Sequence, residues 1–293
     1  TGASGLIGSA LARRLEGEGH AVLHLVRREA RGPGEARWDP AAGTIDAAAL
    51  EGLDALVHLA GENIGVRWTA ERKRAFRVSR VDGTRLLAGT VAKLARKPGA
   101  FVMASAIGIY GERGDERLDE MSAPGSGFLA ELVRDWEAAA HPAADAGVRV
   151  AQLRFGVVFS GRGGALERLL PPFRLGVGGV IGSGRQWMGW LSLDDAVDLL
   201  LFAIRDARVS GPVNAVAGSV TNAEFTRTLA KVLNRPAFVP VPAFGLRLLF
   251  GEMADQTILV SQRVLPRRLT QLGYSFRHPE VEGALRAALA EDG

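Results

Sequence analysis

The chain opens with Thr1-Gly2-Ala3-Ser4-Gly5-Leu6-Ile7-Gly8, a glycine-rich turn that runs directly into a helical pattern. In this spacing Gly2 permits a tight turn, Gly5 lets the backbone approach phosphates, and Gly8 lets the helix lie close to a sheet. The free N–H groups at the start of the helix then face the anion. Glycines also mark ordinary turns, so these three residues alone are a weak signal.

The residues that follow the turn favour the phosphate-binding interpretation. Apolar residues recur at helical spacing from Leu6 to Leu15, Gly17 and Gly19 end the helix, and residues 21–26 read as a buried strand. Such a turn normally follows a strand, so we expect a strand of ~5–6 residues to precede Thr1. Together these features predict an α/β protein with an NAD(P)-binding Rossmann fold. Its sheet is expected to be doubly wound and mostly parallel, with a smaller C-terminal α/β cap.

Strand and helix patterns alternate through the first half of the chain, which predicts a sheet covered on both faces. Strands are expected at 54–60, 100–105 and 148–159, and helices at 69–96, 128–144, 193–204, 222–233, 244–253 and 280–289. The glycine-rich run 176–184 is interpreted as a binding loop. The predicted Rossmann domain covers residues 1–160, with 190–218 packing back on it. Residues 161–189 and 219–293 are assigned to a substrate-side domain that caps the cleft at the carboxyl ends of the strands.

The composition excludes several classes of function. The net charge of +4 comes mostly from arginines scattered among acids, which does not favour a nucleic-acid partner. No run of 18 apolar residues predicts a membrane span. The chain has no cysteine, which excludes disulfides and thiol catalysis and fits a reducing compartment, so we expect a cytoplasmic protein. The histidines show no metal-ligand spacing, so no metal is expected. A small-molecule substrate and a monomer or homodimer are expected.

The choice of cofactor depends on the residues at the end of the strand expected at 21–26, which is the second strand after the one expected before Thr1. NAD-binding Rossmann domains usually carry an acidic residue there that binds the ribose hydroxyls. This chain has Arg27 and Arg28 instead, and the first acid, Glu29, follows them. An arginine can form a charge-assisted contact with a 2′-phosphate, so NADPH is expected to be preferred over NADH. The alternative is that two exposed arginines simply end the strand.

The chain resembles the extended or atypical branch of the short-chain dehydrogenase/reductase superfamily. More narrowly it is similar to the "epimerase family" proteins, a group that includes nucleotide-sugar epimerase-like proteins and bacterial cell-division-inhibitor homologues. The resemblance covers essentially the whole chain. Besides the opening glycines, it rests on residues 58–64, 79–80, 105–111, 136–139, 154–158, 172–176, 182–187, 221–225 and 261–264.

The resemblance implies a set of cofactor contacts. They comprise Gly2, Ser4, Gly5, Leu6, Ile7 and Gly8 in the turn, Arg27 and Arg28 at the adenosine phosphate, Leu59, Ala60, Gly61 and Glu62 after the next strand, and Arg80, Ser105 and Val157. Arg80 and Val157 are implied to lie nearer the nicotinamide. Each has an ordinary alternative, because Leu59, Ala60 and Val157 are also good core residues and Arg80 could be a solvated helix residue.

The usual catalytic pair of the superfamily is missing. Short-chain dehydrogenases carry Tyr-x-x-x-Lys, in which the tyrosinate is the general acid/base. The only tyrosines here, Tyr110 and Tyr274, are followed four residues later by Gly114 and His278. The helix matching residues 128–137, where extended enzymes place the pair, has neither tyrosine nor lysine. The usual Ser/Thr partner is replaced by Ala106, with Ser105 one residue away.

The substrate clamp of nucleotide-sugar enzymes is also missing. Those enzymes often read Gly-x-Gly-x-Gln-x-Arg-Asp, and here Met188 and Gly189 replace the Arg and Asp. The remaining candidates are Asn63, Arg154, Gln186 and Trp187 on the substrate side and Ser105, Tyr110 and Glu62 for catalysis. Ordinary roles compete for the catalytic candidates: a backbone hydrogen bond for Ser105, packing for Tyr110 and a loop charge for Glu62.

Two functions follow from these residues. The first is an NADP(H)-dependent oxidoreductase or epimerase-like enzyme for an unknown small carbonyl or hydroxyl compound, in which the nicotinamide supplies the hydride chemistry. The second is a non-catalytic NADP(H)-binding redox sensor or scaffold, which the missing Tyr/Lys pair favours. Turnover of the nicotinamide with a substrate separates the two.

Overall fold

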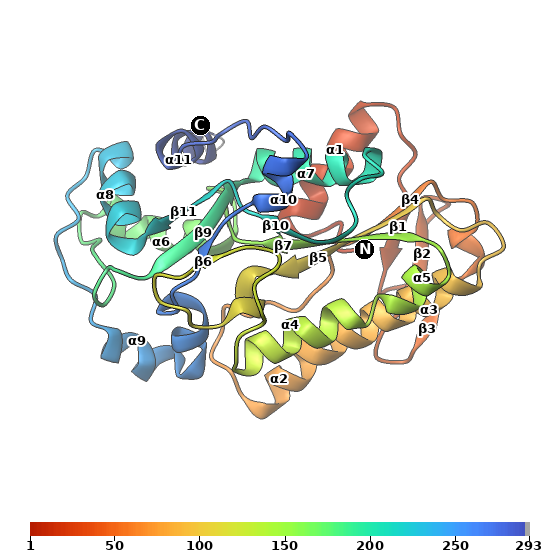
Figure 1. Ribbon diagram of the computed structural model, residues 1–293, viewed down its shortest axis with the longest axis horizontal. Coiled ribbons are helices and arrows are strands. Elements are labelled where there is room, and N and C mark those ends of the chain that lie inside the picture. The colour runs from red at the N-terminus through yellow and green to blue at the C-terminus, as the bar shows by residue number, and fades with distance from the viewer. Residues whose placement is uncertain (291–293) are drawn as a thin grey trace.

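A four-stranded parallel sheet forms the centre of the molecule in the computed structural model, which describes residues 1–290 (Figure 1). Its strands run in the order β10 (Gly211–Ala215), β7 (Arg149–Phe155), β5 (Ala100–Ala106) and β4 (Ala55–His58). The sequence of β5 is apolar on both faces, as expected of a strand with a layer of helices on each side. The carboxyl ends of these strands therefore open onto one edge of the sheet.

A second, smaller sheet lies beside the glycine turn. It contains β1 (His24–Val26), β2 (Glu35–Asp39) and β3 (Thr44–Ile45), in that order. Thr1 lies against the edge of β4, because its amino group donates to the Val57 carbonyl at 2.8 Å and the Leu59 N–H donates to the Thr1 carbonyl at 3.3 Å. The turn thus begins at the carboxyl end of β4, where the cleft was expected.

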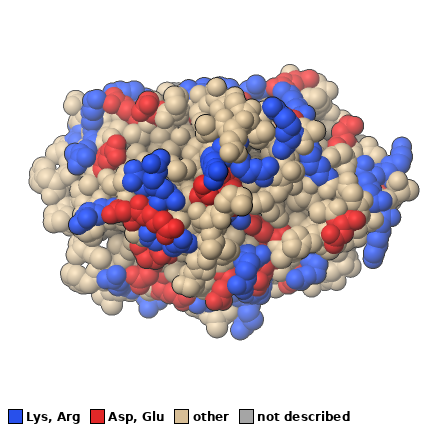
Figure 2. Space-filling view, in the orientation of Figure 1, with Lys and Arg blue, Asp and Glu red and all other residues tan. Residues whose placement is uncertain are grey.

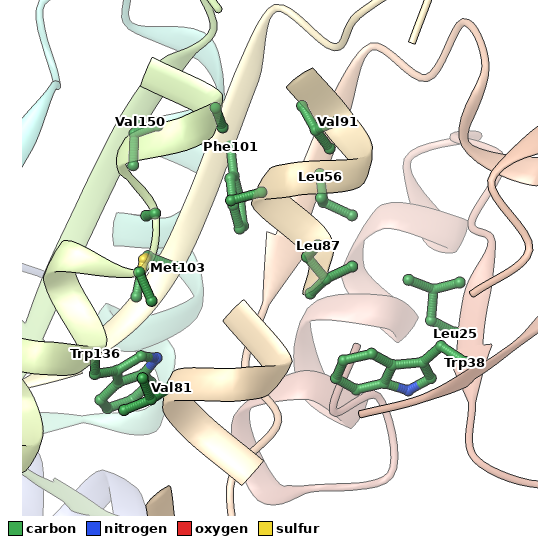
Figure 3. Packing of buried hydrophobic residues seen from close by; sticks show 14 of the residues in the cluster. Leu25, Trp38, Leu56, Val81, Leu87, Val91, Phe101, Met103, Trp136 and Val150 are labelled. Atoms are coloured by element: carbon green, nitrogen blue, oxygen red, sulfur yellow. The ribbon is translucent and has the colours of Figure 1, made fainter. Parts of the chain in front are cut away.

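Helices cover both faces of the central sheet. On one face α1 (Leu6–Gly17) packs beside α7 (Leu193–Arg205), and Val102 of β5 belongs to their apolar cluster. On the other face Phe101 and Met103 pack with α3 (Gly83–Lys93), α4 (Phe128–Ala138) and α5 (His141–Asp145). Figure 3 shows this second cluster, in which Leu87 of α3 and Trp136 of α4 lie around the β5 side chains. The alternation along β5 therefore separates two cores.

The long helix expected at 69–96 is three segments. Thr69 caps α2 (Ala70–Arg77) by accepting from the Arg72 N–H at 3.2 Å. A π-helical segment, η2 (Val78–Asp82), joins α2 to α3, and α3 ends at Lys93 rather than at Arg96. Such π segments are frequent at functional sites. Here η2 carries Ser79 and Arg80 to the loop that follows β4.

The C-terminal part contributes a three-stranded sheet with β11 (Gly218–Thr221), β9 (Trp187–Ser192) and β8 (Val157–Phe159) in that order. Three helices pack on this sheet: α6 (Gly164–Arg174), α8 (Asn222–Leu233) and α11 (Val281–Ala290). The rings of Phe159 and Trp190 stack there at 5.4 Å between centroids. The other elements of the described chain are η1 (Ala48–Leu50), η3 (Ile107–Tyr110), β6 (Arg117–Leu118), α9 (Ala243–Phe250), η4 (Ala254–Ile258), β12 (Arg263–Val264) and α10 (Arg267–Gln271).

Several sequence-based boundaries need correction. The expected strand at 148–159 is divided at Gly156 into β7 and β8. Gly156 lies close to Gly189, since a Cβ on Gly156 would lie only 2.5 Å from the Gly189 carbonyl oxygen. Helix α6 was not expected, since Pro171 and Pro172 fall inside it. The antiparallel pair β2–β3 was also not expected. The substrate-side domain was predicted to extend to residue 293, and 291–293 lie outside the described residues.

The surface carries mixed charge. Figure 2 shows acidic and basic side chains interspersed over the visible face. Within residues 1–290, no helix is long and apolar enough to cross a membrane, and no group of three potential metal-ligating side chains comes together.

Candidate functional site

The glycine turn requires glycine at two positions. Gly2 has φ +74°, and a Cβ there would lie 2.6 Å from the Leu59 carbonyl carbon. A Cβ on Gly8 would lie 2.1 Å from the Gly2 carbonyl oxygen, so Gly8 lets α1 approach the turn itself. Gly5 is the N-cap of α1, and no side chain in the described chain caps this helix start. The N–H groups of the first turn, which Leu6 and Ile7 begin, are thus free to face an anion.

A cleft of about 830 Å³ begins at this turn. It reaches from Gly2, Ser4 and Gly5 to the end of β1 and the loop after β4. Its lining includes the predicted cofactor residues Gly2, Ser4, Gly5, Arg27, Arg28, Leu59, Ala60, Gly61 and Glu62. Ala75, Val78 and Ser79, from α2 and η2, also line it. The structure therefore brings most of the predicted cofactor residues together around one opening.

The two arginines at the end of β1 are bound differently. Arg28 forms two hydrogen bonds with the Glu35 carboxylate, at 2.5 and 2.6 Å. Arg27 makes one longer contact, 3.3 Å to Glu62 Oε1, and its side chain is 73% exposed. Of these two arginines, Arg27 is the one whose guanidinium is largely free to bind an anion from solution.

The loop after β4 is held from η2. Ser79 Oγ accepts from the Glu62 N–H at 3.1 Å, and Arg80 donates to the Glu62 carbonyl at 2.9 Å. The Arg80 guanidinium lies 5.3 Å from the Trp136 ring centroid and close to Gly61, where a Cβ would be 3.0 Å from Arg80 Cζ. Burial lowers the pKa of Arg80 to about 10, so the side chain stays charged at neutral pH. In this structure Arg80 supports the loop after β4 rather than lining the cleft.

Ser105 and Arg154 meet at a buried carboxylate. Arg154 donates to both Glu137 oxygens at 2.8 Å, and Ser105 Oγ donates to Glu137 Oε1 at 2.5 Å. All three residues are buried. Arg154 therefore has a partner within the protein, and the Ser105 hydroxyl proton is already donated to Glu137.

Tyr110 belongs to the same network. Its hydroxyl donates to Asn214 Oδ1 at 2.7 Å and accepts from Arg154 at 3.0 Å. Burial raises the pKa of this hydroxyl, and the nearby Arg154 only partly opposes the rise. Tyr110 is therefore a neutral tyrosine that joins η3 to β10.

The helix that the resemblance assigns to the missing Tyr-x-x-x-Lys pair, α4, carries neither tyrosine nor lysine. Leu129 and Val133, four residues apart on α4, are both buried. Leu129 packs against Gly108, where a Cβ would lie 2.8 Å from Leu129 Cδ2. No titratable side chain can replace the pair from these two positions.

The four substrate-side candidates do not form one cluster. Asn63 Oδ1 accepts from the Gly65 N–H at 2.9 Å, and buried Gln186 donates to the Ile181 carbonyl at 3.0 Å. The Trp187 indole N–H donates to Asp115 at 2.9 Å, and its ring lies 4.3 Å from the Arg263 guanidinium. Asn63 and Gln186 are bonded within their own loops, whereas Trp187 is held by residues from two other segments.

Val157 and the glycine-rich run lie in the C-terminal part. Half-buried Val157 begins β8 and pairs with Trp190. The run 176–184 is bound to residues 239–241, because the Val239 N–H donates to the Gly178 carbonyl and the Gly182 N–H to the Val241 carbonyl. The run does not line the cleft at the glycine turn.

Residues 1–216 match the model of the NAD dependent epimerase/dehydratase family. The chain belongs to this family. Residues 241–288 match a domain of unknown function. The epimerase family protein of Mycobacterium tuberculosis is 43% identical, and the match covers 100% of this chain and 97% of that protein. The human epimerase family protein SDR39U1 is 38% identical over 99% of this chain and 98% of its own.

Solved structures of the family share the fold. The crystal structure of human SDR39U1 (isoform 2) with NADPH superposes with a TM-score of 0.90 and 38% identity, covering 99% of this chain and 97% of that one. The predicted Rossmann-type α/β fold and the resemblance to epimerase family proteins are thereby confirmed. None of these names refers to cell division, so that part of the resemblance is untested.

Sequence reasoning missed the partners of several candidates. Glu137 lies in a matching stretch but received no role, although a glutamate on the apolar stripe of a helix is a signal that a buried cation faces it. Glu35 and Asn214 gave no such signal. Glu35 meets Arg28 through the pairing of β2 with β1, and Asn214 of β10 meets Tyr110 of η3 from a distant part of the chain.

Proposed function

We propose that this protein binds NADPH in the cleft at the glycine turn and acts as an oxidoreductase or epimerase-like enzyme on a small carbonyl or hydroxyl compound. The observation that carries the proposal is the combination of the free helix start of α1 with the exposed Arg27 across the same cleft. The NADPH in the crystal structure of the 38% identical human relative supports it.

The residues at the cleft fit a dinucleotide phosphate. The space beside Gly2 and Gly5 adjoins the N–H groups at the start of α1, which suit a pyrophosphate. Arg27 suits the 2′-phosphate of the adenosine ribose, and Leu59 and Ala60 offer apolar contact beside it. The loop that carries Leu59 to Glu62 is kept in place by Ser79 and Arg80.

The nicotinamide, when bound, supplies the hydride. The protein must then orient the substrate and keep a proton donor within reach of the reacting oxygen. Tyr110 is unsuited to act as a tyrosinate, because its pKa is raised by burial and no lysine adjoins it. Ser105 keeps its proton in a hydrogen bond to Glu137, which leaves its oxygen as an acceptor. A proton donor from the substrate or from water fits these residues better than a side-chain relay.

The same network favours a second candidate function. Ser105 and Arg154 are both bonded to Glu137, Tyr110 is bonded to Arg154, and α4 carries neither tyrosine nor lysine, so the protein could bind NADPH without turnover. It would then act as a redox sensor or scaffold.

Native mass spectrometry of the protein purified from its own host tests both functions. Retained NADP with a second small molecule is the result expected for an enzyme, and that molecule then enters an assay of NADPH oxidation. Retained NADP alone, with no change in NADPH absorbance across a panel of aldehydes, ketones and sugar nucleotides, favours the sensor. Failure both to retain NADP and to take up added NADPH contradicts the proposal as a whole.

A further inference from the structure

The side chain that competes for the 2′-phosphate site is Glu35. It begins β2, which pairs in parallel with β1, and this pairing places Glu35 opposite His24, the first residue of β1. Both of its oxygens accept from Arg28, and one also accepts from the Arg31 N–H at 2.8 Å. Glu35 lines the same cleft as Arg27 and Arg28. An acid therefore stands at the phosphate end of the cleft, although none follows the strand in sequence.

The bidentate geometry determines what Arg28 can still do. A guanidinium has five N–H donors, and in Arg28 the pair Nη1 and Nη2 is taken by Glu35, while Nη1 also donates to the Glu29 carbonyl at 2.8 Å. The single 3.3 Å contact of Arg27 with Glu62 leaves most of its donors free. The two adjacent arginines are thus unequal ligands for an incoming phosphate.

We propose that Glu35 is a specificity-determining residue, which holds Arg28 away from the 2′-phosphate and leaves Arg27 to bind it. This inference rests on the proposed binding of NADPH. Glu35 keeps its charge at neutral pH, because Arg28 and the Arg31 N–H lower its pKa to about 2. A 2′-phosphate must therefore compete with a carboxylate for Arg28, which limits the preference for NADPH over NADH.

Binding of two small probes isolates this end of the cofactor. Isothermal titration of the full chain with 2′,5′-ADP and with 5′-ADP gives the ratio of affinities that reports the 2′-phosphate. Glu35→Gln removes the charge and keeps the shape, so Arg28 is released. We expect the affinity ratio to rise about three- to tenfold in favour of 2′,5′-ADP. Glu116→Gln is the matched control, since Glu116 forms an equivalent bidentate pair with Arg113 on loop residues that do not line the cleft.

A second pair of variants tests the route through Arg28. In an Arg28→Ala background, Glu35→Gln is expected to raise the ratio less than in the wild type, because only the repulsion by the unpaired carboxylate is then removed. A rise of the same size there would overturn the inference, because Glu35 would then repel the phosphate directly. Arg28→Ala alone is expected to lower the ratio less than Arg27→Ala, which tests the inference even if Glu35→Gln fails to fold.

The inference and the proposed function fail differently. If wild-type protein binds NADPH and the ratio in Glu35→Gln stays within about twofold of wild type, the inference alone is overturned. If the Glu116→Gln control shifts the ratio as much as Glu35→Gln, the effect is general charge and the inference is again overturned. If wild-type protein binds neither NADPH nor NADH, both the inference and the proposed function are overturned.

Discussion

Arg154 and Glu137 form a buried, bidentate ion pair between β7 and α4, with both hydrogen bonds at 2.8 Å and side chains only 7% and 11% exposed. Each member of the pair bonds one of the two hydroxyls that the sequence offered for catalysis: Glu137 bonds Ser105, and Arg154 bonds Tyr110. The Glu137 carboxylate accepts from Ser105, and the Arg154 guanidinium donates to Tyr110, so the ion pair links both hydroxyls to the strand and the helix.

Removing the charge of Glu137 is expected to destabilise the fold strongly. Glu137→Gln leaves the buried Arg154 cation without a counter-charge, which costs about 3 kcal/mol or more of unfolding free energy. Urea denaturation followed by circular dichroism measures the loss. The control is Glu116→Gln, which breaks the exposed pair with Arg113 and should leave the midpoint nearly unchanged. Equal losses in the two variants would mean that the buried pair contributes no more than a surface pair.

Arg27 is expected to carry most of the selectivity for NADPH. Arg27→Ala should weaken NADPH binding roughly 10- to 150-fold, as expected for the loss of a hydrogen bond to a charged group, and leave NADH binding nearly unchanged. Arg28→Ala should have a smaller effect, because Glu35 already occupies Arg28. Calorimetric titration with each cofactor measures both. Equal losses for NADPH and NADH would contradict the assignment of the 2′-phosphate to this end of the cleft.

The glycine turn is expected to reject even one methyl group. At Gly2, with φ +74°, an alanine is strained by about 1–2 kcal/mol, and its Cβ would overlap the Leu59–Ala60 backbone. Gly8→Ala should push α1 away from the Gly2 carbonyl. Both variants are expected to lower the thermal midpoint and NADPH affinity. Gly17→Ala is the control, since it lies on the same helix with nothing within 4 Å and should be neutral or stabilising. NADPH affinity that survives Gly8→Ala would argue against this turn as the pyrophosphate site.

His58 is expected to make stability depend on pH. The residue is fully buried in β4, its Nε2 has no hydrogen-bond partner among the described residues, and burial lowers its pKa from 6.5 to about 3. Below pH 6.5 the His58 imidazole is therefore protonated in the unfolded chain but remains neutral in the folded chain. The stability that neutral His58 allows is present above pH 6.5 and is lost as pH falls toward 3, by up to about 1.4 kcal/mol per pH unit.

A variant without the imidazole measures this contribution. Urea unfolding of wild type and of His58→Gln is compared at pH 8 and at pH 5.5. The variant is expected to be less stable at pH 8 but to lose less stability on acidification. Parallel losses in the two proteins would show that other groups account for the pH dependence.

Much of the fold could be predicted from local pattern. The helix over 222–233 has the predicted bounds, and Thr221 caps it by accepting from the Glu224 N–H. The apolar runs at 100–105 and 193–204 became a central strand and a covering helix nearly as expected. Local patterns were misleading where a distant contact decided the outcome. The strand predicted over 148–159 divides at Gly156, where the backbone packs closely against Gly189. Pro171 and Pro172 lie inside α6 despite their low helix propensity.

The sequence by itself determined the glycine turn, the two arginines that follow β1 and the absence of the Tyr/Lys pair, because each is a property of neighbouring residues and their spacing. Only the tertiary structure decided what those residues can still do. Pairing of β1 with β2 brings Glu35 into contact with Arg28. Packing of α4 against β5 and β7 brings Glu137 within hydrogen-bond distance of Ser105 and Arg154. The physical reason is that a side chain's free donors depend on which charges the fold brings within hydrogen-bond reach, and those charges come from other strands and helices rather than from neighbouring residues.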